Sequence, residues 1–260
     1  MRLEHCLLAC NENEKYLNYW PSIKRAWNNV IGIPVTMVYI GDTIPEHLKN
    51  DLDVKLFKPI EDMPTATQAQ MIRLLYPAIM QCTKGVVISD MDLMPLNKDF
   101  FHKGFLDATE DQFVSLKAPM EKCKEVCMAY VGATPSTWSE IMNIKTIDDI
   151  RKRLEEWSEV YIANGIHGGL GWSSDQLELY KRVKSWEETC PNRLNISKWE
   201  WDYPRLDRVM PYEWIEPTPQ LESRIFHFHY IDFHMPSIIN YSNQIEYVLS
   251  VAEKRAQSST

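Results

Sequence analysis

The chain has 260 residues, of which 45% are hydrophobic, and a formal net charge of −8. This length and apolar content are sufficient for one sizeable domain with its own core. The acidic balance argues against a broad phosphate-binding surface, so no nucleic-acid partner is expected.

The first part of the chain alternates predicted strands and helices. Apolar, β-branched runs predict strands over residues 3–10, 33–40 and 54–57, and helical periodicity covers residues 14–30. A strand, a helix and a second strand at this spacing form a βαβ unit with a parallel sheet. A further helix is predicted over residues 65–82, with a break at Pro77.

The most informative segment follows this helix. A short apolar strand over residues 86–88 is followed by Asp90 and Asp92. Residues two apart on extended backbone point to the same side, and ligands of open α/β sheets bind beyond the carboxyl ends of the strands. Two carboxylates side by side repel each other unless a cation lies between them, and Mg²⁺ or Mn²⁺ prefers such ligands. The pattern indicates a metal-bound diphosphate, although Asp-x-Asp also serves simply to end a strand.

The cysteines and the N-terminus bear on the cellular setting. Cys6 and Cys10 lie in a predicted core strand, which favours reduced thiols over disulfides. The first strand begins close to Met1, so no targeting peptide is expected, and no apolar run reaches the ~18 residues of a membrane-spanning helix. We therefore expect a cytoplasmic protein without an integral membrane segment.

The second part of the chain contains further strand and helix signals. Strands are predicted over residues 113–116 and 126–132, followed by a helix from Pro135. A helix over residues 146–160 begins with the capping pattern Thr146-x-x-Asp149. A closing helix is predicted over residues 236–256.

A glycine-dense loop precedes another helix. It contains Gly169, whose lack of a side chain allows a ligand to approach the backbone closely, and it leads to Trp172, Asp175 and Gln176. The same residues also fit a capping box formed by Ser173 and Gln176. Both a binding function and helix capping are therefore compatible with the pattern.

Two C-terminal segments carry aromatic and imidazole side chains. The long segment 190–219 is rich in proline and aromatic residues, which suits either a sugar-stacking surface or a hydrophobic cluster. A strand is predicted over residues 224–230, and its alternation places His227 and His229 on one side.

Residues 87–96, Val-Ile-Ser-Asp-Met-Asp-Leu-Met-Pro-Leu, resemble the Asp-x-Asp segment of nucleotide-sugar glycosyltransferases of the GT-A fold, in the glycogenin/galactosyltransferase-like group. Agreement with this family extends from residue 3 to about residue 236. The resemblance implies a Rossmann-like α/β fold with a mixed, mostly parallel sheet flanked by helices. It also implies one domain over residues 1–260, with a nucleotide-binding half (1–95) and an acceptor half (96–260).

The resemblance implies roles for particular residues. Asp90 and Asp92, with Met91 between them, are expected to bind the metal ion, with His229 as third ligand because Pro236 follows it at the family's spacing. His227 and His234 are the alternatives for the third ligand. The family's usual glycine and lysine are replaced here by Asp232 and Met235, which leaves the phosphate contact open.

The remaining assignments concern the donor. Asn11, Asn13 and Tyr16 are expected near the nucleotide base, with turn formation and helix capping as the alternative for the asparagines. Arg73 is expected to contact the donor sugar or its phosphates. Asp175, in the family's Asp-Gln motif, is expected to contact the donor sugar and, with Arg73, to act in catalysis. The expected donor-binding set is Asn11, Tyr16, Arg73, Asp90, Met91, Asp92, Gly169, Trp172, Asp175 and Gln176.

These observations predict a glycosyltransferase, of the hexosyl or pentosyl type, that depends on Mn²⁺ or Mg²⁺. It is expected to move a sugar from a nucleotide diphosphate donor to a carbohydrate acceptor, which is a glycan or a protein-linked sugar. The resemblance implies a UDP-sugar, because such donors are the most frequent in the family. Two alternatives are a phosphohydrolase of the HAD class, which also uses Asp-x-Asp after a strand, and a non-catalytic sugar-binding module. The HAD motif requires Thr or Val at the position of Met94, so it fits less well.

Overall fold

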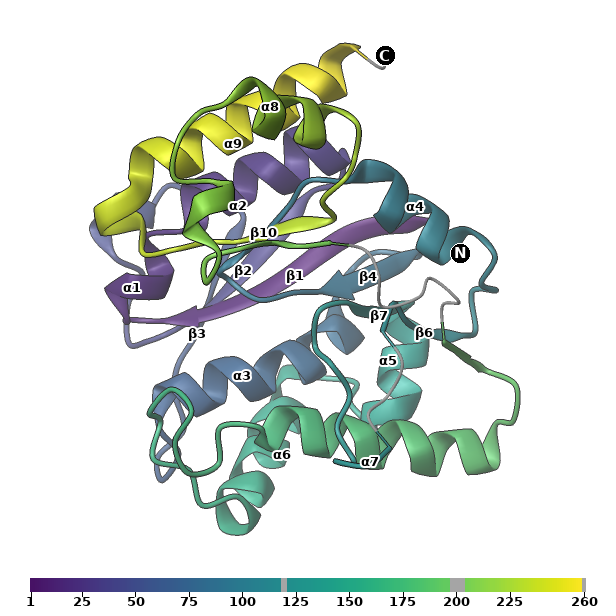
Figure 1. Cartoon of the computed structure of the whole chain (residues 1–260). Coiled ribbons are helices and arrows are strands. Elements are labelled where there is room, and N and C mark those ends of the chain that lie inside the picture. Colours follow the sequence, from purple (N-terminus) through teal and green to yellow (C-terminus); the bar gives the residue numbers. More distant parts are fainter. Residues whose placement is uncertain (118–120, 197–203, 259–260) are drawn as a thin grey trace.

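A central sheet with helices on both faces organises the molecule (Figure 1). The structure is a computed structural model, and it describes residues 1–117, 121–196 and 204–258. Its main sheet has seven strands in the order β3-β2-β1-β4-β7-β6-β8. A mixed, mostly parallel α/β fold is therefore confirmed.

The strands of the main sheet are mostly parallel because helices connect the first four. β1 pairs in parallel with β2 and β4, and β2 pairs with β3, whereas β7 runs antiparallel to both β4 and β6. The pairing of β6 with β8 is parallel again. The strands are β1 (Leu3–Asn11), β2 (Val35–Ile40), β3 (Val54–Phe57), β4 (Gly85–Ile88), β6 (Phe113–Ser115), β7 (Val131–Ala133) and β8 (Leu194–Ile196).

A second, three-stranded sheet lies against the first. Its order is β5-β10-β9, with β10 antiparallel to β5 and parallel to β9. Because β5 follows β4 almost directly, this small sheet brings the C-terminal part of the chain to the end of β4. Its strands are β5 (Leu93–Pro95), β9 (Leu206–Asp207) and β10 (Asp232–His234).

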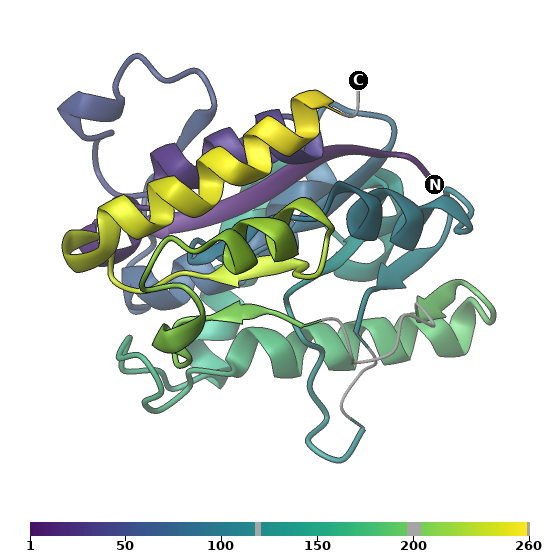
Figure 2. The ribbon, with the colours of Figure 1, turned by 45° about the horizontal axis from the view of Figure 1, so that its top comes forward.

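The helices divide the core into two apolar clusters, one on each face of the main sheet (Figure 1). One cluster contains residues of α2, η1, α4, α8 and α9, and Figure 2 shows α9 extending along the N-terminal helices. The other contains residues of α3, α5, α6 and α7. The helices are α1 (Glu14–Leu17), α2 (Trp20–Arg25), η1 (Ala26–Ile31), η2 (Glu46–Leu48), α3 (Thr65–Leu75), η3 (Tyr76–Ile79), α4 (Lys98–Leu106), α5 (Pro135–Met142), α6 (Ile147–Val160), α7 (Ser174–Thr189), η4 (Pro211–Glu213), α8 (Pro219–Phe226) and α9 (Ile238–Ser258).

Most predicted elements are present, and the local signals explain them. The capping box at Thr146 is formed, with both reciprocal bonds to Asp149, and α6 begins there. The predicted break at Pro77 is also observed, since α3 passes into the short 3-10 helix η3 at this point. Helix α4 and strand β5 were not predicted.

Two sequence-based expectations are wrong. The strand predicted over residues 224–230 does not form, because α8 continues to Phe226 and the strand of this region, β10, begins at Asp232. The strand predicted over residues 126–132 is also shorter than expected, since β7 covers only Val131–Ala133. In both cases tertiary packing rather than alternation decides where the strand lies.

None of the described helices is long and apolar enough to cross a membrane. All six cysteines are free thiols.

A buried carboxylate of the second sheet pairs with an arginine beside β9 and bonds a tyrosine next to the main sheet. Asp232, fully buried on β10, accepts two hydrogen bonds from Arg205, from Nε to Oδ1 at 2.6 Å and from Nη2 to Oδ2 at 2.7 Å. The hydroxyl of Tyr130, which directly precedes β7, donates to Oδ2 at 2.8 Å. A carboxylate without exposed surface is costly to bury unless such partners compensate its charge and satisfy its oxygens.

We expect Arg205→Leu to lower the free energy of unfolding by about 3–5 kcal/mol, because Asp232 would remain buried without its cation. Urea unfolding at pH 7 measures this change. Arg205→Lys is the matched control; it keeps the charge but loses the planar pair of donors, so its loss should be smaller. A stability of Arg205→Leu within about 0.5 kcal/mol of the wild type would contradict the expectation.

Candidate active site

A cavity of about 350 Å³ opens beyond the carboxyl ends of β1 and β4. The chain proceeds from β1 to β2 and β3 on one side of the sheet and then returns to β4 on the other side of β1. This reversal of strand order leaves a crevice between the connections, which is where open α/β sheets bind ligands. The volume lies in the range of small-molecule binding sites.

The cavity brings together most of the residues selected from the sequence. Only Gly169 and His229 of that set are not part of its lining. The selected residues that line it are Asn11, Tyr16, Arg73, Asp90, Met91, Asp92, Trp172, Asp175 and Gln176.

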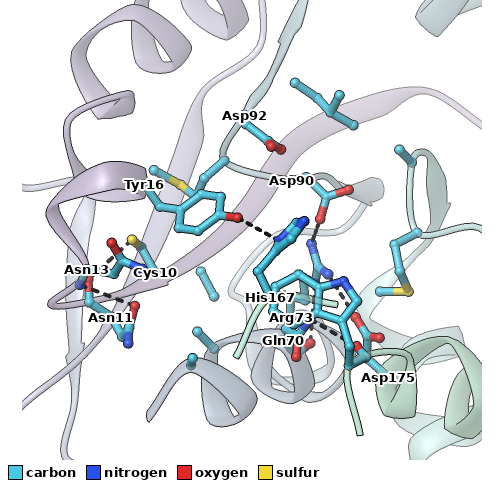
Figure 3. A pocket seen from close by; sticks show the side chains of 18 of the residues that line it. Cys10, Asn11, Asn13, Tyr16, Gln70, Arg73, Asp90, Asp92, His167 and Asp175 are labelled. Carbon is cyan, nitrogen blue, oxygen red and sulfur yellow. Dashed lines mark hydrogen bonds and ion pairs between the residues drawn. The ribbon is translucent and has the colours of Figure 1, made fainter. Parts of the chain in front are cut away.

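The Asp-x-Asp segment forms a tight turn between β4 and β5. The backbone N–H of Leu93 donates to the carbonyl of Asp90 at 3.3 Å. The expectation that residues 90–92 form extended backbone is therefore wrong. The two carboxylates consequently face different partners, and Asp90 points to Arg73 (Figure 3). Both side chains still line the same cavity.

Arg73 connects the turn to helix α7. Its guanidinium bonds Asp90, the carbonyl of Ser89 at 3.2 Å, and Asp175 Oδ2 at 2.8 Å. Burial lowers the pKa of Arg73, but the charges of Asp90 and Asp175 outweigh this and raise it. The arginine therefore stays charged although only 9% of its side chain is exposed.

Asp175 is nearly inaccessible at the start of α7, with 2% of its side chain exposed. Burial raises its pKa above the usual value, although the charge of Arg73 acts in the opposite direction. Its Oδ1 also accepts the backbone N–H of Gln176 at 2.8 Å. The capping box considered for Ser173 is absent, since this side chain makes no capping hydrogen bond.

Asp92 faces the C-terminal segment instead. Its Oδ2 accepts a hydrogen bond from Arg208 Nη1 at 2.9 Å and lies 3.4 Å from His234 Nε2. Burial raises the pKa of Asp92, but its contacts with His234 and Arg208 outweigh burial and hold the pKa below the usual value. Asp92 is thus an ionised carboxylate beside an imidazole.

The imidazole at the cavity belongs to His234 and not to His229. His234 lies on β10, where the backbone N–H of Met235 bonds the carbonyl of Asp92 at 2.9 Å. His229 follows α8 as an exposed residue, with its ring edge-on to Tyr230 at 4.9 Å between centroids. The expected proximity of His229 to the two aspartates is therefore not observed, because the predicted strand on which it depended does not form. His227 is the C-cap of α8 and is also exposed.

The glycine-dense loop is attached to both sides of the cavity. The hydroxyl of Tyr16 lies 3.0 Å from His167 Nδ1, and the His167 ring packs on Trp172 at 4.4 Å between centroids (Figure 3). Gln70 Nε2 donates to the Trp172 carbonyl at 3.1 Å. A side chain at Gly169 would collide with Asn164, so this glycine serves packing within the loop.

The asparagines at the end of β1 have local partners. Asn13 is the N-cap of α1, and its side chain accepts the backbone N–H of Lys15, as the capping alternative expected. Asn11 donates to the Thr65 hydroxyl at 3.1 Å and lines the cavity.

Sequence reasoning missed two arginines of the cavity, Arg205 and Arg208. They lie in the segment 190–219, which was interpreted from its proline and aromatic residues alone. Two arginines three residues apart, shortly before a histidine-rich segment of an acidic chain, were the available signal. Of the aromatic residues in this segment, Trp199, Trp201 and Tyr203 lie outside the described residues, Trp214 is buried, and Tyr212 is exposed.

The donor atoms suit a hard divalent cation. Asp90, Asp92 and His234 place carboxylate oxygens and an imidazole on one cavity wall, which are ligands that Mn²⁺ and Mg²⁺ accept. In contacts with the described residues, Asp90 uses only Oδ1 and Asp92 only Oδ2. Within the same residues, no three His, Cys, Asp or Glu side chains already form a metal-binding group.

Comparisons with known proteins give distant structural likenesses. No protein-family model and no curated protein sequence matches the chain. Among solved structures, it is similar to the galactosyltransferase LgtC in complex with donor and acceptor sugar analogs, with 12% identity, a TM-score of 0.46, and coverage of 96% of this chain and 95% of that chain. The apo-form glycosyltransferase GlyE of Streptococcus pneumoniae TIGR4 is similar with 12% identity and a TM-score of 0.49, and the match covers 100% of this chain and 64% of that chain. Mouse xyloside xylosyltransferase 1 in its apo form is similar with 8% identity and a TM-score of 0.42, and the match covers 89% of this chain and 97% of that chain. These likenesses are too distant to carry an argument about function, which rests on the cavity itself.

We expect Tyr16→Phe to loosen the glycine-dense loop without weakening the fold, because the lost contact with His167 is exposed. Amide hydrogen exchange over residues 163–172 should become faster, while the free energy of unfolding changes by less than about 0.5 kcal/mol. The exposed Tyr212→Phe is the matched control. Unchanged exchange in the loop of Tyr16→Phe would show that other contacts hold it.

Proposed function

We propose that this protein is a metal-dependent glycosyltransferase that uses a nucleotide diphosphate sugar. The observation that carries the proposal is the cavity at the sheet's switch point, which collects Asp90, Asp92 and His234 beside the buried pair of Arg73 and Asp175. Ionised carboxylates and an imidazole suit a divalent cation, and arginines on the same wall suit phosphates. A site of this composition favours a substrate that combines a diphosphate with a hydroxyl-rich group.

The two parts of the chain contribute to different sides of the proposed site. Residues of the first 95, around Asn11 and Tyr16, would receive the nucleotide, with Arg73 between it and the sugar. The later part contributes the loop with Trp172, Asp175 and Gln176. We propose that these later residues face the donor sugar and the acceptor.

Each charged residue has a role that follows from its contacts. Arg73 orients Asp90 and Asp175 and compensates their charge, since it contacts both at once. Asp175 would accept a hydrogen bond from a donor-sugar hydroxyl at the cavity wall, because its Oδ2 is held by Arg73 and its position is fixed by the start of α7. Asp90, Asp92 and His234 would hold Mn²⁺ or Mg²⁺. The bound cation supplies Lewis-acid neutralisation of the charge that develops on the leaving diphosphate.

We propose UDP as the nucleotide and a carbohydrate as the acceptor. The phosphohydrolase is the weaker candidate, because Asp90, which would be the nucleophile of that class, is paired with Arg73. A non-catalytic sugar-binding module would bind donor without turnover, so transfer activity separates it from the enzyme.

We expect sugar transfer from a UDP-sugar to be lost in EDTA and restored by Mn²⁺. Asp92→Asn should lower kcat/KM by about 100-fold or more even with Mn²⁺ added, because it removes the charge that a cation requires. Radiolabelled donors with a panel of simple glycan acceptors measure this activity. Asp111→Asn, at a side chain that is 61% exposed, is the matched control and should behave as the wild type.

Full transfer in EDTA would exclude the metal-dependent mechanism. Turnover of a general phosphatase substrate, without sugar transfer, would instead favour the phosphohydrolase.

We expect thermal shift to identify the donor nucleotide. Ligand at about 100 times its Kd stabilises the folded state by about 2.7 kcal/mol, so the matching nucleotide should raise the Tm by several degrees. UDP, GDP, ADP and CMP, each with and without Mn²⁺, form the panel. The largest shift should appear for UDP with Mn²⁺, and an equal shift for all four nucleotides would contradict a specific base site.

A further inference from the structure

We propose that Arg208 is an exchangeable counter-ion, which neutralises Asp92 in the free protein and passes to the substrate's diphosphate when a divalent cation takes that carboxylate. The inference rests on the proposed function and adds to it a phosphate-binding residue and an order of events. Neither the Asp-x-Asp pattern nor the C-terminal histidine segment indicates this residue.

The three arginines of the cavity differ in how firmly they are held. Arg73 is 9% exposed and contacts two carboxylates and two carbonyls. Arg205 makes two hydrogen bonds to the fully buried Asp232. Arg208 contacts Asp92 through Nη1 alone, and 27% of its side chain is exposed. Of the three, Arg208 loses least by leaving its partner.

The backbone beneath Arg208 is fixed, so a movement of the side chain would not disturb the fold. The backbone N–H of Arg208 donates to the carbonyl of His234 at 3.0 Å, next to the pairing of β9 with β10. The indole N–H of Trp214 donates to the carbonyl of the preceding residue, Asp207, at 2.8 Å. The guanidinium is therefore mounted on rigid backbone at the cavity wall, where it can change partner by rotation about its own side-chain bonds.

Charge balance requires the exchange if a cation binds. Arg208 and His234 both contact Asp92 Oδ2, so a cation at this carboxylate would meet a guanidinium within the same small volume. Like charges at this separation repel, and the arginine would be displaced. A diphosphate that arrives with the cation offers the displaced guanidinium a better partner, because the planar donors of arginine match two phosphate oxygens at once.

If the Arg208–Asp92 pair had only a structural role, removing Arg208 would affect ligand binding differently. If Arg208 only held the segment around residue 208 to the Asp-x-Asp turn, its loss would weaken every ligand at the turn. If it exchanges, its loss removes a competitor of the metal ion and a partner of the diphosphate. The affinity for Mn²⁺ should then rise, and the affinity for UDP should fall.

The experiment measures both ligands with Arg208→Gln. Free Mn²⁺ is followed by electron paramagnetic resonance without nucleotide, and UDP binding by calorimetry at saturating Mn²⁺. We expect Mn²⁺ to bind about fivefold more tightly, in line with the loss of a partly exposed ion pair. UDP should bind at least about tenfold more weakly, in line with the loss of a charged hydrogen bond.

Two further variants complete the test. Arg224→Gln removes a surface arginine whose side chain is 40% exposed, and both affinities should match the wild type. Arg208→Lys keeps the charge without the paired donors, so Mn²⁺ should bind as in the wild type and UDP more weakly. Arg208→Lys decides the question if Arg208→Gln does not fold.

The exchange would be overturned if Arg208→Gln bound Mn²⁺ more weakly than the wild type, or if it bound both Mn²⁺ and UDP unchanged. Unchanged UDP affinity in Arg208→Lys would also overturn it. These outcomes leave the proposed function intact as long as the wild type transfers sugar. A wild type that binds neither UDP nor Mn²⁺ and transfers no sugar would overturn the proposed function itself.

Discussion

Compensation of buried negative charge is the constraint on which this site depends. Asp92 and Asp175 are both buried at the cavity wall, and Asp90 pairs with Arg73, which also contacts Asp175. Carboxylates in such positions lose hydration and stay ionised only beside cations. Arg73 and Arg208 supply these cations from two different parts of the chain. Without these arginines, Asp92 and Asp175 would be buried charges without a cation, and the site would be poorly suited to bind a metal ion or to orient a hydroxyl.

The fold provides this compensation by bringing distant segments to one edge. The reversal of strand order beside β1 opens the crevice, and α3 places Arg73 beneath the end of β4. Helix α7 then presents Asp175 from the same side of the main sheet as α3. The second sheet adds the C-terminal part of the chain, since β10 pairs with β5 directly after the Asp-x-Asp turn and carries His234 to Asp92. The Arg205–Asp232 pair joins the segments of β9 and β10, and the Tyr130 hydroxyl bonds Asp232 from the main sheet.

The arginines of the cavity divide into structural and exchangeable partners. Arg73 and Arg205 each have several buried contacts, so removing either would leave a carboxylate buried without its cation. Among the described residues, Arg208 contacts Asp92 through a single hydrogen bond and remains partly exposed, which suits the exchange that we propose. A site built in this way keeps its architecture when it is empty and still allows its charges to rearrange around an anionic substrate.

The sequence by itself determined the repeated strand–helix units, most of their boundaries, and the set of polar residues that follow the buried strands. Local signals were sufficient for these features: β-branched runs predicted β1 to β4, a capping box predicted the start of α6, and strand ends predicted Asp90, Asp92 and the edge at which they lie. Only the tertiary structure decided which partner each carboxylate has and which histidine reaches the cavity. Alternation at His229 was a local pattern, whereas the place of His234 depends on the pairing of β10 with β5, two strands separated by more than half the chain. Long-range pairing of this kind leaves no periodic signal in the sequence, because it is set by which apolar faces pack together once the main sheet has formed.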